Sequence, residues 1–106
     1  MAQRSKYRAV PTVVDNVRFA SKKEARRYEE LVMLSRANKI SHLQLQPGFR
    51  LEVKGQLICT YVADFQYLDL GAMHVVTEDV KGVKTPVYRL KKKLLKALYD
   101  IDIVEV

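Results

Sequence analysis

Two stretches of the sequence decide the fold, residues 57–67 (LICTYVADFQY) and residues 73–81 (MHVVTEDVK). Both are rich in β-branched and aromatic residues, which favour strands. The turn sequence Asp69-Leu70-Gly71 lies between them, so they predict two antiparallel neighbours. Asp64 interrupts the first stretch inside an apolar run. A carboxylate in that position costs free energy unless it is paired or bound to a metal.

The flanking sequence predicts a further strand, two helices and a last short strand. Residues 49–53 alternate apolar and polar side chains, and 54–56 turn the chain into 57–67. Ser21 to Glu24 matches a capping box and starts a helix that fades near residues 37–38. Pro86 suits the first turn of a second helix, with helical periodicity to Ile101. Residues 101–106 alternate as a strand, whereas 40–48 are expected to form a connection with a short alternating piece.

These elements predict one α/β domain of the mixed α+β kind, in the order α-β-β-β-α-β. At 106 residues the chain can bury one modest core. We expect residues 1–18 to form a basic N-terminal arm, with a short extended piece at 12–17, and residues 19–106 to form the core. The single cysteine, Cys59, excludes an intramolecular disulfide and is expected in the core. No stretch reaches the length of a membrane span, and we expect a cytoplasmic protein without structural zinc.

The charge distribution points to a polyanionic partner. The chain carries 19 Lys and Arg against 12 Asp and Glu, for a formal charge of +7. The basic residues gather in the arm (Arg4, Lys6 and Arg8), at the start of the first helix and between Lys81 and Lys96. Three clusters suit contacts with a nucleic-acid backbone. The alternative is a set of solvated faces that bind nothing specific.

Strand alternation selects the candidate catalytic residues. Asp79 and Lys81 point to one face of their strand, while Glu78 points to the other and is expected at the core edge or surface. Pairing through residues 69–71 would bring Asp64 beside Asp79. Two carboxylates can hold Mg²⁺ or Mn²⁺, and an ammonium can offset charge on a reacting phosphate. The alternative is an Asp–Lys ion pair beside a spare aspartate.

Four ordered segments carry a family resemblance. Residues 19–24 (FASKKE), 46–47 (QP), 61–65 (YVADF) and 78–82 (EDVKG) resemble the PD-(D/E)XK nuclease superfamily, and in particular its small phage-encoded members. Ala63 stands where the superfamily's name has proline. The resemblance implies a restriction-endonuclease-like core and a Mg²⁺- or Mn²⁺-dependent DNA endonuclease, with Asp64, Asp79, Lys81 and Glu24 catalytic. Of these, Asp64, Asp79 and Glu24 are expected metal ligands. The capping box is the rival role of Glu24.

The resemblance also implies a substrate and a setting. A structure-specific phage resolvase for Holliday junctions or other branched DNA is expected, in a bacterial host and as a homodimer. No separate sequence-reading domain is recognised, which disfavours a restriction enzyme. Gln46 is a possible residue at the edge of the site. Expected DNA contacts are Lys22, Lys23, Arg26, Lys84, Tyr88, Arg89, Lys91, Lys92 and Lys93. The alternatives are a nickase or repair nuclease without junction preference, a non-catalytic DNA-binding module, and a basic assembly protein.

Overall fold

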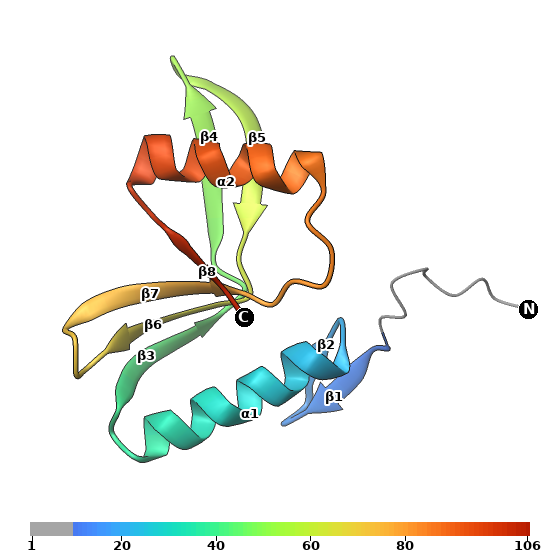
Figure 1. Cartoon of the computed structure of the whole chain (residues 1–106), viewed down its shortest axis with the longest axis vertical. Coiled ribbons are helices and arrows are strands. Elements are labelled where there is room, and N and C mark those ends of the chain that lie inside the picture. Colours follow the sequence, from blue (N-terminus) through green and yellow to red (C-terminus); the bar gives the residue numbers. More distant parts are fainter. Residues whose placement is uncertain (1–9) are drawn as a thin grey trace, which may run out of the picture.

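The computed structural model describes residues 10–106 as an α+β fold with mixed sheets and two helices (Figure 1). Residues 1–9, with the predicted basic cluster of the arm, lie outside the described part. The elements in chain order are β1 (Thr12–Val14), β2 (Val17–Phe19), α1 (Lys22–Arg36), β3 (Ile40–Leu45), β4 (Gly48–Val53), β5 (Gln56–Val62), β6 (Phe65–Asp69), β7 (His74–Asp79), α2 (Pro86–Tyr99) and β8 (Ile103–Glu105).

The main sheet has four strands in the order β3-β6-β7-β8. The pairs β3–β6 and β6–β7 are antiparallel, and β8 runs parallel to β7 after the crossover through α2. Strands β4 and β5 form a separate two-stranded ribbon between β3 and β6 in the sequence. Without the ribbon and the N-terminal hairpin β1–β2, the chain order is helix, three strands, helix, strand.

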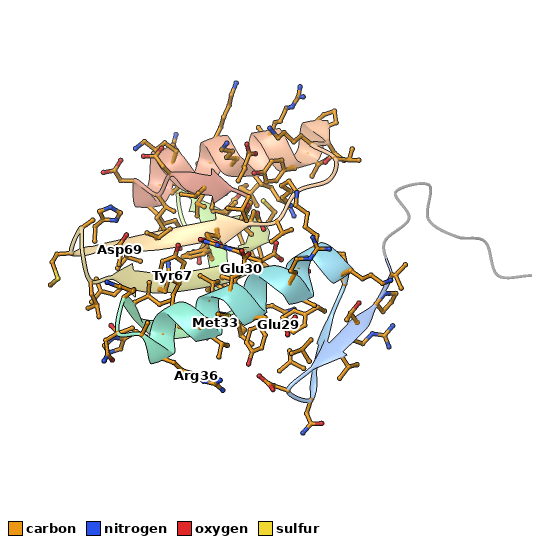
Figure 2. The ribbon with its side chains drawn as sticks, turned by 60° about the horizontal axis from the view of Figure 1, so that its bottom comes forward. Glu29, Glu30, Met33, Arg36, Tyr67 and Asp69 are labelled. Carbon is orange, nitrogen blue, oxygen red and sulfur yellow. The ribbon has the colours of Figure 1, made fainter. Side chains whose placement is uncertain are left out.

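Two hydrophobic cores flank the sheet. The first lies under α1 and includes Leu31, Phe65 and Tyr67. The second lies between the ribbon and α2, with Leu51, Leu95 and other side chains, and Cys59 packs against it. Figure 2 shows α1 on one side of the sheet and α2 on the other, with Tyr67 on the strand next to α1. The sheet therefore lies between α1 with the first core and α2 with the second.

Both helices begin where the sequence predicts. The backbone N–H of Glu24 donates to the Ser21 hydroxyl over 3.1 Å, which caps α1. The backbone N–H of Tyr88 donates to the Thr85 hydroxyl over 3.1 Å, and Pro86 follows this cap at the start of α2. Each hydroxyl satisfies one of the free backbone donors of a first turn.

The observed strands differ from the prediction at two segments, residues 40–45 and residues 57–67. Residues 40–45, expected to be a connection, form β3 and pair with β6. Their pattern is irregular because His42 and Gln46 have positive φ angles of 55° and 53°, and the register shifts between Ser41 and Gln44. Residues 57–67, expected to be one strand, are divided between β5 and β6. The residues near 12–17 form part of the hairpin β1–β2.

Within residues 10–106, neither helix has the length and apolar composition needed to cross a membrane.

Candidate active site

Asp64 lies beside the end of β7. It occupies the break between β5 and β6, and the register that pairs Phe65 with Glu78 continues toward Asp64 and Asp79. The backbone N–H of Asp64 donates to the Glu78 carbonyl over 3.1 Å. Its carboxylate Oδ2 accepts from the backbone N–H of Val80 over 2.7 Å. The Asp64 side chain is therefore attached to the segment that carries Asp79 and Lys81.

Asp79 is the last residue of β7, and only 1% of it is exposed. Its Oδ2 accepts a hydrogen bond from the Tyr61 hydroxyl and lies 3.6 Å from Nζ of Lys81. Burial raises the pKa of Asp79 to about 6, and the charge of Lys81 opposes that rise. The pair predicted from strand alternation is thus in contact, and the carboxylate is desolvated.

Glu24 reaches the same site from the first turn of α1, where it is 6% exposed. Burial first, and then the charge of Asp64, raise the pKa of Glu24 to about 6; Asp79 contributes in the same direction. Burial also raises the pKa of Asp64, against the Val80 hydrogen bond and the charge of Lys81. The three carboxylates are close enough to interact electrostatically, and each holds its negative charge at a cost.

A cleft of about 510 Å³ opens over this group. Glu24, Asp64 and Lys81 line it, together with Lys22 and Lys23 from the start of α1 and the segment of residues 80–85. Carboxylates and lysines that line the same cleft suit a phosphate that is bound together with a cation. The cleft therefore combines groups from α1, the β5–β6 break and the end of β7.

Glu78 differs from the expectation of a core-edge or surface charge. It is fully buried on the α1 side of the sheet. Arg27 donates to both of its carboxylate oxygens, over 2.8 and 2.6 Å, and the Tyr67 hydroxyl donates to it as well. The alternation that sends Asp79 toward Lys81 sends Glu78 toward α1, where Arg27 neutralises it. This ion pair fixes α1, and thus Glu24, against β7.

The expected DNA contacts at the start of α1 are open to solvent. Lys22, Lys23 and Arg26 are exposed, and the first two line the cleft. Nζ of Lys23 also donates to the Lys81 carbonyl over 3.3 Å. Arg27, from the same basic cluster, is engaged by Glu78. Lys22 and Lys23 therefore border the site on the α1 side.

Some of the expected DNA-contacting residues on α2 and just before it are engaged within the protein, and others are exposed. Nζ of Lys84 and of Lys92 lie 3.1 and 3.4 Å from the Glu105 carboxylate. Lys91 donates to the Thr60 carbonyl over 3.2 Å. Arg89 and Lys93 are exposed. The lysines near Glu105 are partly neutralised, which leaves Arg89 and Lys93 as the more open cations of this surface.

Tyr88 and Gln46 lie next to the site but do not line the cleft. Tyr88, expected to contact DNA, is 8% exposed, and its hydroxyl donates to Oε2 of Glu105 over 2.6 Å. Gln46, a possible residue at the site edge, is exposed and does not line the cleft; its backbone N–H donates to the Asp64 carbonyl over 3.0 Å. The main chain of Gln46, rather than its amide side chain, is what supports Asp64.

Sequence reasoning missed three residues that hold the site: Arg27, Tyr61 and Glu105. Arg27 belongs to the basic cluster at the start of the first helix, and nothing in its local sequence distinguishes it from its charged neighbours. Tyr61 is three residues before Asp64 in the apolar run, and only the break after β5 lets its hydroxyl reach Asp79. The last alternating segment, residues 101–106, contains two acidic residues, Asp102 and Glu105. A carboxylate in this apolar segment was the only sign in the sequence that Glu105 has a partner.

The donor chemistry of the site fits a hard divalent cation. Such ions prefer carboxylate oxygens, and three carboxylates with raised pKa values interact here. Within residues 10–106, however, no three His, Cys, Asp or Glu side chains are already arranged as a set that could hold a metal ion. Glu24, Asp64 and Asp79 therefore fit a divalent cation by the chemistry of their side chains, but they are not arranged as a ready set of ligands.

The comparisons with known proteins give one match. A family model described as "Protein of unknown function (DUF1064)" matches residues 4–104, nearly the whole chain. No curated protein and no solved structure matches it. Because the match covers far more than half of the sequence, the chain belongs to the DUF1064 family.

Proposed function

We propose that this protein is a metal-dependent DNA endonuclease of the PD-(D/E)XK type. The observation that carries the proposal is the group at the end of β7. Glu24, Asp64 and Lys81 line a cleft there, Asp79 lies next to Lys81, and burial raises the pKa of each of the three carboxyl groups. Buried carboxylates with raised pKa values, placed close to one another, are typical of functional sites, including those that bind a cation.

Each residue has a distinct part in the proposed reaction. Asp64 and Asp79 would hold the cation, with Glu24 as a third ligand. When bound, the cation supplies Lewis acidity toward the scissile phosphate. Lys81 would offset the negative charge that builds on the phosphate oxygens as the phosphodiester bond is cut. The exposed lysines at the start of α1 would bind the neighbouring phosphates, which carry no sequence information.

The arrangement of the main sheet supports the same proposal. When the hairpin β1–β2 and the ribbon β4–β5 are set aside, α1, β3, β6, β7, α2 and β8 follow as helix, three strands, helix and strand, with β3 in the place predicted for residues 49–53. This order supports the proposal of a restriction-endonuclease-like core. Asp64 directly precedes β6 and Asp79 ends β7, and these two strands are paired neighbours. A four-way or otherwise branched DNA, cut by a homodimer, is the substrate we propose first, on the strength of the phage-family resemblance.

One observation favours a second candidate, a non-catalytic DNA-binding module. Within residues 10–106 no group of three acidic side chains is already arranged to hold a metal. On that proposal Lys81 and Asp79 are an ion pair at 3.6 Å that stabilises the end of β7, and the surface lysines bind DNA without cutting it.

The two candidates differ in metal-dependent cutting. The test uses end-labelled four-way junction, duplex and single-stranded DNA, each with Mg²⁺, Mn²⁺ or EDTA. Asp79→Asn and Lys81→Met are the active-site variants. Their matched controls are Asp102→Asn and Lys39→Met, which make the same changes at exposed positions. Binding is measured in parallel by fluorescence anisotropy in EDTA.

The endonuclease proposal predicts cutting by the wild type and both controls in Mg²⁺ or Mn²⁺, and none in EDTA. It predicts that Asp79→Asn and Lys81→Met bind DNA but cut at least 100-fold more slowly, in the range seen when a main catalytic group is removed. Salt-sensitive binding without cutting on every substrate would establish the DNA-binding module instead.

A further inference from the structure

The ammonium group of Lys81 has two neighbours that hold it in place. Lys81 follows β7 in the irregular segment of residues 80–85, where no strand or helix orients its long side chain. Its Nζ lies 3.6 Å from Oδ2 of Asp79 and 4.2 Å from the centre of the Tyr88 ring. A lysine side chain has four flexible bonds, so one contact alone would leave the ammonium free to swing around Asp79. The Tyr88 ring restricts the ammonium from a second side.

Tyr88 is held firmly enough to provide this second contact for the Lys81 ammonium. It lies in the first turn of α2, capped by Thr85, and only 8% of it is exposed. Its ring is 6.3 Å from the Tyr61 ring, and Tyr61 in turn donates to Asp79. A cation over an aromatic face is attracted by the ring's negative face, most strongly where water is excluded. Tyr88 therefore contacts both partners of the Asp79–Lys81 pair, one directly and one through Tyr61.

Glu105 fixes the orientation of the Tyr88 ring. The Tyr88 hydroxyl donates to Oε2 of Glu105 over 2.6 Å. Hydrogen bonds from Tyr88 and Lys84 lower the pKa of Glu105 to about 2, so that it stays an anion at any working pH. Because Glu105 belongs to β8, which pairs with β7 next to Asp79, the ring is tied to the sheet that carries the site.

We propose that Tyr88 is a positioning residue, whose ring holds the Lys81 ammonium beside Asp79 and whose hydroxyl is anchored by Glu105. The placement of Lys81 follows from the geometry alone. Its consequence for phosphodiester cleavage rests on the proposed function. Tyr88 was predicted to contact DNA, and its burial and its contact with Lys81 support this additional role.

Two substitutions at position 88 separate the ring from the hydroxyl. Tyr88→Phe keeps the ring and loses the Glu105 hydrogen bond, whereas Tyr88→Leu loses the ring. Leu95→Ala is the matched control, because it opens a cavity in the same core without removing the ring next to Lys81. Thermal melts set a temperature at which all three variants are folded. Single-turnover cleavage gives the rate of the bound complex, and anisotropy gives the DNA affinity.

The cleavage result expected is a loss of rate with unchanged DNA affinity in Tyr88→Leu. Displacing a catalytic group by about 1 Å costs up to about 100-fold, so we expect a loss of roughly 10- to 100-fold. Tyr88→Phe recovers most of that loss, and Leu95→Ala stays close to the wild-type rate. Equal rates in Tyr88→Leu and Leu95→Ala would overturn the positioning role.

A readout without catalysis tests the placement itself. The ring lies next to the Lys81 ammonium and shifts the adjacent methylene protons upfield in NMR spectra, with Lys81→Met identifying their resonance. We expect the upfield shift in the wild type, Tyr88→Phe and Leu95→Ala, and its loss in Tyr88→Leu. A resonance unchanged by Tyr88→Leu would overturn the placement. If the wild type cuts no DNA, the proposed function fails, while the shift still decides whether Tyr88 holds Lys81.

Discussion

Replacing Glu24 by glutamine should stabilise the protein at neutral pH in the absence of divalent cations. Glutamine keeps the size of the side chain and an oxygen that can accept a hydrogen bond, but it removes one of three interacting negative charges. Burial and the charge of Asp64 raise the pKa of Glu24 from 4.5 to about 6. The folded state therefore favours the neutral form of this group, which glutamine imitates.

The size of the effect follows from that difference in pKa. Each pKa unit corresponds to about 1.4 kcal/mol between the two protonation states, so the interval from 4.5 to about 6 gives an upper bound of about 2 kcal/mol. Because the folded pKa lies above the unfolded one, the stability conferred by the neutral carboxyl is present below pH 4.5 and lost as the pH rises through about 6. The gain from Glu24→Gln should thus be near zero at pH 4.5 and about 1–2 kcal/mol at pH 7.5.

Urea unfolding in EDTA at the two pH values measures this difference. Glu29→Gln is the matched control, an exposed glutamate on the same helix (Figure 2), and should change the free energy of unfolding by less than about 0.5 kcal/mol. A loss of stability in Glu24→Gln at pH 7.5, or a gain that is the same at both pH values, would refute the reasoning. A loss would mean that other contacts of the Glu24 carboxylate outweigh its burial and its repulsion by Asp64, and an equal gain at both pH values would mean that the effect does not come from its charge.

Three further predictions follow from the contacts around the site. Arg27→Met leaves the Glu78 carboxylate buried without its partner and should cost about 3–5 kcal/mol in urea unfolding, of which a second change, Glu78→Gln, should recover a large part. Lys22→Gln should reduce the slope of log Kd for DNA against log salt concentration by about 1, whereas Lys96→Gln, already paired with two aspartates, should leave it unchanged. Ser21→Ala should cost about 1 kcal/mol of stability through loss of the α1 cap, and Ser21→Asn should restore it.

Much of the fold was predictable because local rules govern it. Both helix starts depend on a cap within four residues, and alternation identifies β7 and its turn from β6. The break at Asp64 was not predictable, because no Gly or Pro marks it and residues 57–67 read as one β-rich run. β3 was not predicted because its pairing is irregular. His42 has a positive φ angle, and the register with β6 shifts between Ser41 and Gln44.

The residues of the candidate site likewise fall into those that the sequence predicts and those that it does not. Strand alternation places Asp79 with Lys81 and turns Glu78 away, and both follow from spacing alone. What holds the site depends on tertiary contacts between distant segments. Tyr61, Tyr88 and Glu105 belong to three separate elements and meet only because the ribbon, α2 and β8 share the second core.

The cleavage of a labelled four-way junction in Mn²⁺ by the wild type and by Asp64→Asn tests the central claim most directly. Both proteins are compared with Asp102→Asn, at equal DNA occupancy. The account predicts cutting by the wild type and by Asp102→Asn, and at least a 100-fold slower rate for Asp64→Asn. Cutting by Asp64→Asn at the wild-type rate would contradict the claim that these carboxylates form the catalytic centre.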